Sequence, residues 1–212
     1  MKKHILCLGD SNTHGYCADP NDCADHGIRF NENERWTCLL QKALGDEYLI
    51  TEEGLSGRTT VFQDALHESM DALSVAYPLL KSHEYIDLLV IMLGTNDTKD
   101  RFGMNAACIA LGMERLVRKC MSVDCWGPNK PNVLIVAPPH IGEELNDPCM
   151  GTGCAAKSRE LAHYYKIKAD LLGCHFMDAN GCEFNKIDFM HLTRNGHAQL
   201  AEKLAALIPQ IL

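Results

Sequence analysis

The chain has 212 residues, of which 46% are hydrophobic and 23% charged, so it can bury a sizeable core like an ordinary globular protein. Its formal net charge is -8 and its Lys and Arg residues do not cluster, which argues against a nucleic-acid partner. The basic start is followed by an apolar run too short for a secretory signal, and no run reaches the ~20 residues of a membrane span. We therefore expect a soluble, cytoplasmic protein without a membrane partner.

The predicted elements alternate between strands and helices, without repeats and without a linker rich in Gly, Pro or Ser. The predicted order is strand 4–9, helix 35–45, strand 48–53, helix 69–83, strand 86–93, helix 105–121, strand 132–137, helix 157–173, strand 174–179 and helix 195–208. Gly45 and Gly173 are placed to end two of the helices, and Pro78 must kink or end a third. This alternation predicts one α/β domain over residues 1–212, with a five-stranded, mostly parallel sheet covered by helices on both faces.

Small and polar residues follow the predicted strands. The five segments are GDSNTHG (9–15), EGLSGRTT (53–60), GTNDTKD (94–100), PPHIGEE (138–144) and NGCEFNKIDFMHLT (180–193). In open parallel sheets, ligands bind outside the carboxyl ends of the strands, and these segments would gather there. Four of the five segments carry Gly beside Ser, Asn, Asp or His, so their convergence predicts a reactive site on one rim.

The residue types in these segments fit a serine nucleophile. A serine hydroxyl needs a base to remove its proton and donors to stabilise the oxyanion that forms. We expect Ser11 to be the nucleophile, His191 the base, and Asp188 the carboxylate that orients His191. The backbone N–H groups of Ser11 and Gly57 and the side-chain amide of Asn96 are the expected oxyanion donors.

Each of these residues also has a simpler interpretation. Ser11 could be a turn or helix-capping residue, Gly57 a plain turn residue, Asn96 part of an Asx-turn, and Asp188 a cap of the final helix. An Asp-Ser pair also occurs in carrier proteins that bear phosphopantetheine, but those are small helical units. A non-catalytic binding module on the same fold is a further alternative. The joint placement at strand ends favours the catalytic interpretation.

Other chemistries find no support in the sequence. The motifs G-x-S-x-G, G-x-G-x-x-G and the P-loop are absent, and no His or Cys spacing is typical of a metal site, so we expect neither metal nor cofactor. The eleven cysteines are scattered without a Cys-x-x-Cys pair. Only Cys149 and Cys154 lie close enough together to be of interest, and free thiols are the favoured interpretation.

At these residues the sequence resembles the SGNH hydrolases, also called the GDSL esterase family. Its four blocks occur in order as GDSN, SGRTT, GTND and DFMHLT, although Asn12 stands where the family has Leu, a mild departure that touches no catalytic group. The flanks ERWTCLLQKALG, ITEEGLSGRTT and IMLGTNDTKDRF resemble the arylesterase and acyltransferase branch. The segment 138–160, which would form the substrate wall, departs most.

This resemblance implies a three-layer α/β/α sandwich, a flavodoxin-like fold. It also implies a serine esterase that hydrolyses, or transfers to alcohols, small acyl groups from small-molecule esters, in a chain that forms a homo-oligomer. A carbohydrate O-acetylesterase with the same triad is the alternative. We expect His14, Leu55 and Ile141 in the pocket wall, although the last two are equally well explained as core residues.

Overall fold

The computed structural model describes residues 1–212, and its centre is a five-stranded sheet in which every strand pair is parallel. The strand order is β2-β1-β3-β4-β5, one of the two common orders of doubly wound sheets. The elements are β1 (Lys3–Gly9), α1 (Ser11–His14), α2 (Trp36–Leu44), β2 (Tyr48–Gly54), α3 (Ala72–Ser82), β3 (Leu88–Met92), the 3-10 turns η1 (Asn96–Thr98) and η2 (Asp100–Phe102), α4 (Ala106–Met121), β4 (Val133–Ala137), α5 (Cys154–Leu172), β5 (His175–Asp178) and α6 (Arg194–Ile211).

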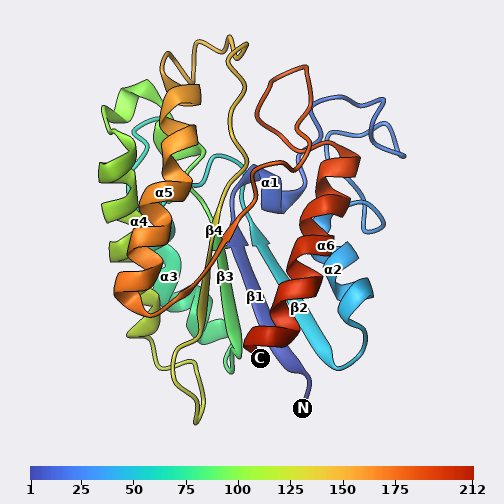
Figure 1. Cartoon of the computed structure of the whole chain (residues 1–212), viewed down its shortest axis with the longest axis vertical. Coiled ribbons are helices and arrows are strands. Elements are labelled where there is room, and N and C mark those ends of the chain that lie inside the picture. Colours follow the sequence, from blue (N-terminus) through green and yellow to red (C-terminus); the bar gives the residue numbers. More distant parts are fainter.

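Alternating residues of the strands supply two separate cores, one on each face of the sheet. In β1, Leu6 and Leu8 pack into the core with α3, α4 and α5, whereas Ile5 and Cys7 pack into the other core with α2 and α6. Figure 1 shows the same three layers, with α3, α4 and α5 on one side of the sheet and α2 and α6 on the other. The predicted α/β/α sandwich is therefore confirmed, and its sheet is wholly parallel.

The predicted strands and helices are all present, with ends that differ by a few residues. Gly45 and Gly173 end α2 and α5 with φ angles of 75° and 66°, the left-handed region that glycine tolerates. Of the two effects expected of Pro78, a kink or an end of the helix, the end does not occur, because α3 continues to Ser82. Proline has no N–H, so the carbonyl of Ser74, four residues earlier, lacks its helical hydrogen bond. Both residues lie on the exposed face of α3, so water can donate to this carbonyl instead.

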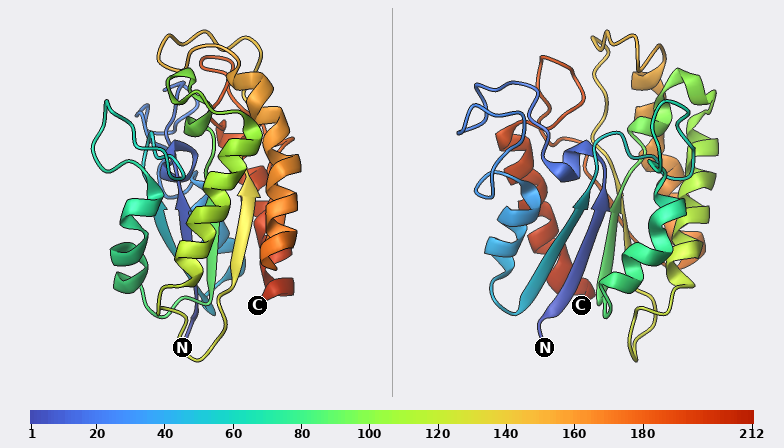
Figure 2. Two further views of the ribbon diagram at one scale, coloured as in Figure 1. Left: turned by 90° about the vertical axis from the view of Figure 1, so that its left-hand side faces the viewer. Right: turned by 180° about the vertical axis from the view of Figure 1, so that it is seen from behind.

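The order of the strands fixes where a site can form. Strand β1 lies between β2 and β3, so the chain leaves β1 toward one side and returns with β3 on the other. A crevice forms at the carboxyl ends of the strands at such a reversal. Both views in Figure 2 show the loops that follow the strands gathered at one end of the sheet, with the two termini at the other end. No helix has both the length and the apolar composition to cross a bilayer.

Candidate active site

Ser11 is the first residue of α1, directly beyond the carboxyl end of β1. The Asp10 side chain caps this four-residue helix by accepting a hydrogen bond from the N–H of Asn12 at 3.0 Å. A Cβ at Gly9 would lie 2.0 Å from a threonine side chain of α1, and one at Gly54 would lie 2.1 Å from its backbone. Glycine at these two positions therefore lets α1 pack closely on the sheet and holds Ser11 at its edge.

His191 connects Ser11 with Asp188. The His191 Nε2 atom lies 2.7 Å from Ser11 Oγ, and its Nδ1 atom lies 2.6 Å from Asp188 Oδ2. The second oxygen of Asp188 accepts the N–H groups of Met190 and His191, each at 3.1 Å. Asp188 and His191, which follow β5, thus form a continuous chain of hydrogen bonds with Ser11, which follows β1.

Asn185 holds the turn that carries Asp188 and His191. Its Oδ1 accepts the N–H groups of Ile187 and Asp188 at 2.8 and 2.9 Å. Its Nδ2 donates to Asp188 Oδ1 at 2.9 Å and to the His191 carbonyl at 2.8 Å. The positive φ of Phe189, 56°, closes the turn. Asn185 was not predicted from the sequence, although Asn often accepts a hydrogen bond from the backbone two residues on in an Asx-turn, as it does here from Ile187.

Asn12 fixes the same turn from the opposite side. Its Oδ1 accepts the N–H of Leu192 at 2.9 Å, and its Nδ2 donates to the Met190 carbonyl at 3.4 Å. These two partners are the neighbours of His191 on either side. The residue that departs from the GDSL pattern therefore makes contacts that position the His191 backbone. No local sequence signal could reveal them, because the partners lie about 180 residues away.

The carboxylates around the site differ in their electrostatics. Burial opposes ionisation of Asp188, but the hydrogen bond and charge of His191 and the two backbone N–H groups outweigh it and lower its pKa to about 2. Burial instead raises the pKa of Asp10 and of Asp97 to about 6 each. Asp97 accepts hydrogen bonds from the backbone and hydroxyl of Thr60, and neither Asp10 nor Asp97 contacts Ser11 through a hydrogen bond. These two carboxyl groups therefore hold the loops around the site and do not act on the serine directly.

Gly57 and Asn96 lie in the same cavity as Ser11. Gly57 has a φ of 90°, and its N–H makes no hydrogen bond within the chain. One N–H of the Asn96 amide donates to the Arg58 carbonyl at 3.1 Å, which fixes the amide and leaves its second N–H available. The structure therefore brings together all five residues that the sequence analysis selected for chemistry.

The cavity has a volume of about 370 Å³. Its lining consists of Ser11, Tyr16, Ser56, Gly57, Leu66, His67, Thr95, Asn96, Lys99, Arg101, Asp147, Cys149, Met150, Asp188, Met190 and His191. The three expected pocket residues are not among them. Ile141 is buried behind the cavity against Met150 and Met190, Leu55 is 40% exposed, and His14 ends α1 beside Gly15. The pocket wall could not be predicted because it depends on side-chain direction in long loops.

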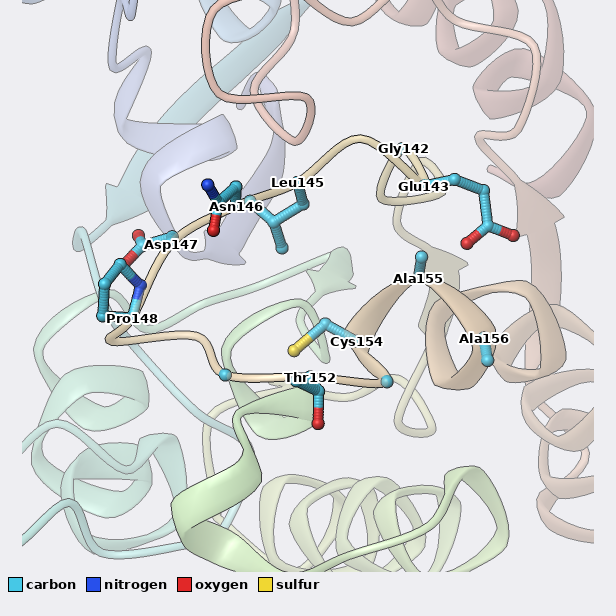
Figure 3. Close-up of a pocket in the computed structure, with 12 residues that line it drawn as sticks. Gly142, Glu143, Leu145, Asn146, Asp147, Pro148, Thr152, Cys154, Ala155 and Ala156 are labelled. Carbon is cyan, nitrogen blue, oxygen red and sulfur yellow. The ribbon is translucent and has the colours of Figure 1, made fainter.

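The segment before α5 lines a second cavity, of about 380 Å³, between residues 142 and 156 (Figure 3). Its lining contains no histidine and no cationic side chain, so it offers no nucleophile with a base. Cys154 is buried there, and its thiol donates to the carbonyls of Thr98 and Met150. Cys149 is exposed, and both cysteines are free, as the sequence indicated. No group of His, Cys, Asp and Glu side chains is arranged to hold a metal ion.

The chain is similar to known proteins in both sequence and structure. The sequence model of the GDSL-like lipase/acylhydrolase family matches residues 7–199. The aryl esterase of M. smegmatis is 34% identical with a TM-score of 0.88, and the match covers 99% of this chain and 100% of that one. Est24, a carbohydrate acetylesterase from Sinorhizobium meliloti, is 35% identical with a TM-score of 0.88 over 100% of both chains. No match was found among proteins with curated descriptions.

A more distant structure shares the fold alone. A member of the lipolytic G-D-S-L family from Veillonella parvula is 16% identical, with a TM-score of 0.70 over 98% of each chain. The family model covers most of the sequence, and the two closer structures extend over essentially the whole chain. The chain therefore belongs to the GDSL-like lipase/acylhydrolase family, has the fold of the SGNH hydrolases, and is a carboxylic ester hydrolase.

Proposed function

We propose that the protein hydrolyses small-molecule esters of short acyl groups, with Ser11 as nucleophile, His191 as general base and Asp188 as the carboxylate that orients His191. The observation that carries this proposal is the chain of hydrogen bonds at 2.7 Å and 2.6 Å through the two ring nitrogens of His191. A nucleophile, a base and an orienting carboxylate in this contact form the arrangement by which a catalytic triad activates serine.

In the first half of the reaction, Ser11 Oγ attacks the acyl carbon while His191 Nε2 takes its proton. The Nδ1–H donates to Asp188, whose low pKa of about 2 keeps it ionised and able to stabilise the imidazolium. His191 then protonates the leaving alcohol, and an acyl-enzyme remains. In the second half, His191 takes a proton from water, the hydroxide attacks the acyl-enzyme, and Ser11 regains its proton as the acid departs.

The oxyanion of both tetrahedral intermediates would be held by the N–H groups of Ser11 and Gly57 and by the Asn96 amide. The free N–H of Gly57 and the fixed amide of Asn96 support this role. A donor that is held in place before reaction loses no reorganisation energy when the charge develops, and one such donor contributes about 3 kcal/mol. The positive φ of Gly57 is needed to direct its N–H as observed.

The size of the cavity supports short acyl groups. A volume of about 370 Å³ is near the lower end of the range for small-molecule sites, roughly 300–1,000 Å³. The Tyr16 ring packs against the His191 ring, with ring centroids 4.6 Å apart, and forms part of the cavity wall. An alcohol can replace water in the second half of the reaction, so product analysis with an added alcohol measures acyl transfer beside hydrolysis.

Deacetylation of carbohydrates is a second candidate function. The 35% identity to the carbohydrate acetylesterase Est24 over both whole chains favours it. The same triad would remove an acetyl group from a sugar hydroxyl. Parallel assays with phenyl acetate and with acetylated xylose measure the preference, and a higher kcat/KM for the sugar ester would favour this candidate over an aryl esterase.

The decisive experiment for the proposed function compares wild type with Ser11→Ala. We expect wild type to hydrolyse p-nitrophenyl acetate faster than longer-chain esters, and Ser11→Ala to lose this activity while keeping its fold. A fluorophosphonate should label wild type alone. A folded wild-type protein that resists labelling and hydrolyses no ester would instead indicate a binding module, and the proposal would be wrong.

A further inference from the structure

Lys99 presents an ammonium group without a hydrogen-bond partner to the cavity that contains Ser11. It follows η1, lines the cavity, and is only 7% exposed. Its ammonium group makes no hydrogen bond within the chain, and the only carboxylate oxygen within 4 Å is Asp64 Oδ2 at 3.9 Å. A buried ammonium normally has close partners, because its desolvation is costly. An ammonium without partners at a cavity wall therefore points to a ligand.

The carboxylate of Asp64 is already neutralised by another residue. Arg101 holds both of its oxygens, with Nε at 3.2 Å and Nη2 at 2.6 Å, in the bidentate geometry that pairs guanidinium with carboxylate. The remaining Arg101 nitrogen donates to the Cys149 carbonyl at 2.7 Å. Burial lowers the pKa of Lys99, and the charge of Arg101 lowers it further. Each nitrogen of Arg101 therefore already has an acceptor, whereas the Lys99 nitrogen has none.

Thr95 supplies a second uncommitted polar group on the same wall. It is 3% exposed and lines the cavity, and its hydroxyl has no hydrogen-bond partner in the chain. Its oxygen is shielded from the cavity, however, so a bound group could not reach it without a shift of the side chain. Thr95 and Lys99 are four residues apart around η1, on either side of Asn96 in the same loop. The Lys99 ammonium is therefore the group of this loop that can reach a ligand bound beside the Ser11 nucleophile.

No other charged group of the cavity forms a hydrogen bond with Lys99. Asp188 is engaged by His191, and Asp147 uses one carboxylate oxygen to accept the Cys149 N–H at 2.7 Å. His67 lies on an exposed loop at the rim. The buried carboxyl groups of Asp10 and Asp97 attract Lys99 but have no oxygen within 4 Å of its nitrogen. The Lys99 ammonium is therefore the cationic group of the cavity that lacks a hydrogen-bond partner.

We propose that Lys99 binds a carboxylate carried by the ester substrate, so that the protein prefers anionic esters to their neutral isosteres. This inference rests on the proposed function, because it places the anionic group next to the ester attacked by Ser11. The carboxylate belongs either to the acyl group or to the alcohol that leaves. In both cases it would accept a hydrogen bond from the Lys99 ammonium, which lacks an acceptor within the chain.

Two matched substrate pairs test this subsite. Monoethyl succinate against ethyl levulinate tests a carboxylate on the acyl side, and p-acetoxybenzoate against p-acetylphenyl acetate tests one on the leaving side. The members of each pair differ in intrinsic reactivity, so the measured quantity is the anionic-to-neutral ratio of kcat/KM in a variant relative to wild type. For at least one pair we expect Lys99→Met to lower this ratio tenfold or more, which corresponds to about 1.4 kcal/mol.

The control is Lys166→Met, which removes an equal charge from α5 outside the cavity, where Lys166 pairs with Asp170. We expect it to change the ratio less than twofold. Ratios that do not respond to Lys99→Met in either pair, or that respond equally to Lys166→Met, would overturn the subsite. Hydrolysis of neutral esters would then still support the proposed function, whereas a wild type that hydrolyses no ester would contradict that function itself.

A measurement on unaltered protein covers the case in which Lys99→Met does not fold. Succinamate and p-hydroxybenzoate, with their neutral amides succinamide and p-hydroxybenzamide, are compared as competitive inhibitors of p-nitrophenyl acetate hydrolysis. We expect at least one anion to inhibit ten times more strongly than its amide, and the difference to shrink as salt is added. Equal inhibition by anion and amide in both pairs would contradict the subsite.

Discussion

Replacing Asn96 with Ala tests the oxyanion hole, because the amide is removed while the serine, histidine and aspartate remain. One preorganised donor contributes about 3 kcal/mol to the transition state, so kcat should fall about 100-fold or more. The donor acts only when the oxyanion forms, and KM should therefore change little. The substitution also removes the hydrogen bond of 3.1 Å to the Arg58 carbonyl, which costs about 1 kcal/mol of stability.

The assay is steady-state hydrolysis of p-nitrophenyl acetate, with urea unfolding measured on the same samples. Asn132→Ala is a matched control, since the Asn132 side chain likewise donates to a backbone carbonyl, that of Ile211 at 3.2 Å, but far from the cavity. We expect a similar small loss of stability and unchanged kcat in this control. A kcat within threefold of wild type for Asn96→Ala would refute the assignment of Asn96 as an oxyanion donor.

Substitutions at three further positions test positioning, backbone geometry and buried charge. Asn12→Ala should lower kcat by roughly 10- to 100-fold at similar KM, because the backbone on either side of His191 loses its hydrogen bonds to Asn12. Asn12→Asp keeps the acceptor for the Leu192 N–H and should recover most of the rate of hydrolysis and of fluorophosphonate labelling. Equal losses in both variants would contradict a positioning role for Asn12. Gly57→Ala should cost about 1–2 kcal/mol in urea unfolding and lower kcat, since an L-residue is strained at a φ of 90°; wild-type stability and kcat would contradict this. Burial raises the pKa of Asp97 to about 6, so the folded state binds its proton more tightly than the unfolded state and stability gains as pH falls from above 6 toward 4. Asp97→Asn should remove this gain in stability. The free energy of unfolding in urea, measured against pH for wild type and Asp97→Asn, tests this, and identical slopes over that pH range would contradict it.

The fold was predictable because its signals are local. The apolar runs that became β3 and β4 are buried on both faces, and Gly45 and Gly173 end their helices as the sequence indicated. Ser11 and Asn96 could be placed at one rim because the carboxyl ends of parallel strands lie together. Helix α1 was missed because four residues are too few to show a periodicity.

The rest of the site depends on contacts between distant parts of the chain. Asn12 reaches the backbone beside His191, and Arg101 joins Asp64 to Cys149. Lys99 points into the cavity rather than into solvent because η1 and η2 fold its loop back, which no periodicity predicts. The homo-oligomer and the cytoplasmic location stay predictions. The molar mass of the purified protein, measured by light scattering, tests whether it forms an oligomer.

The central claim is that an acyl group passes through the Ser11 hydroxyl. Mass spectrometry of protein quenched in acid during hydrolysis of p-nitrophenyl acetate tests it directly. We expect the peptide that contains Ser11 to carry the added mass of one acetyl group. The acetylated fraction of this peptide should be larger in a variant that deacylates more slowly than wild type. Rapid hydrolysis with no acetyl group on that peptide, or with the acetyl group on another residue, would contradict it.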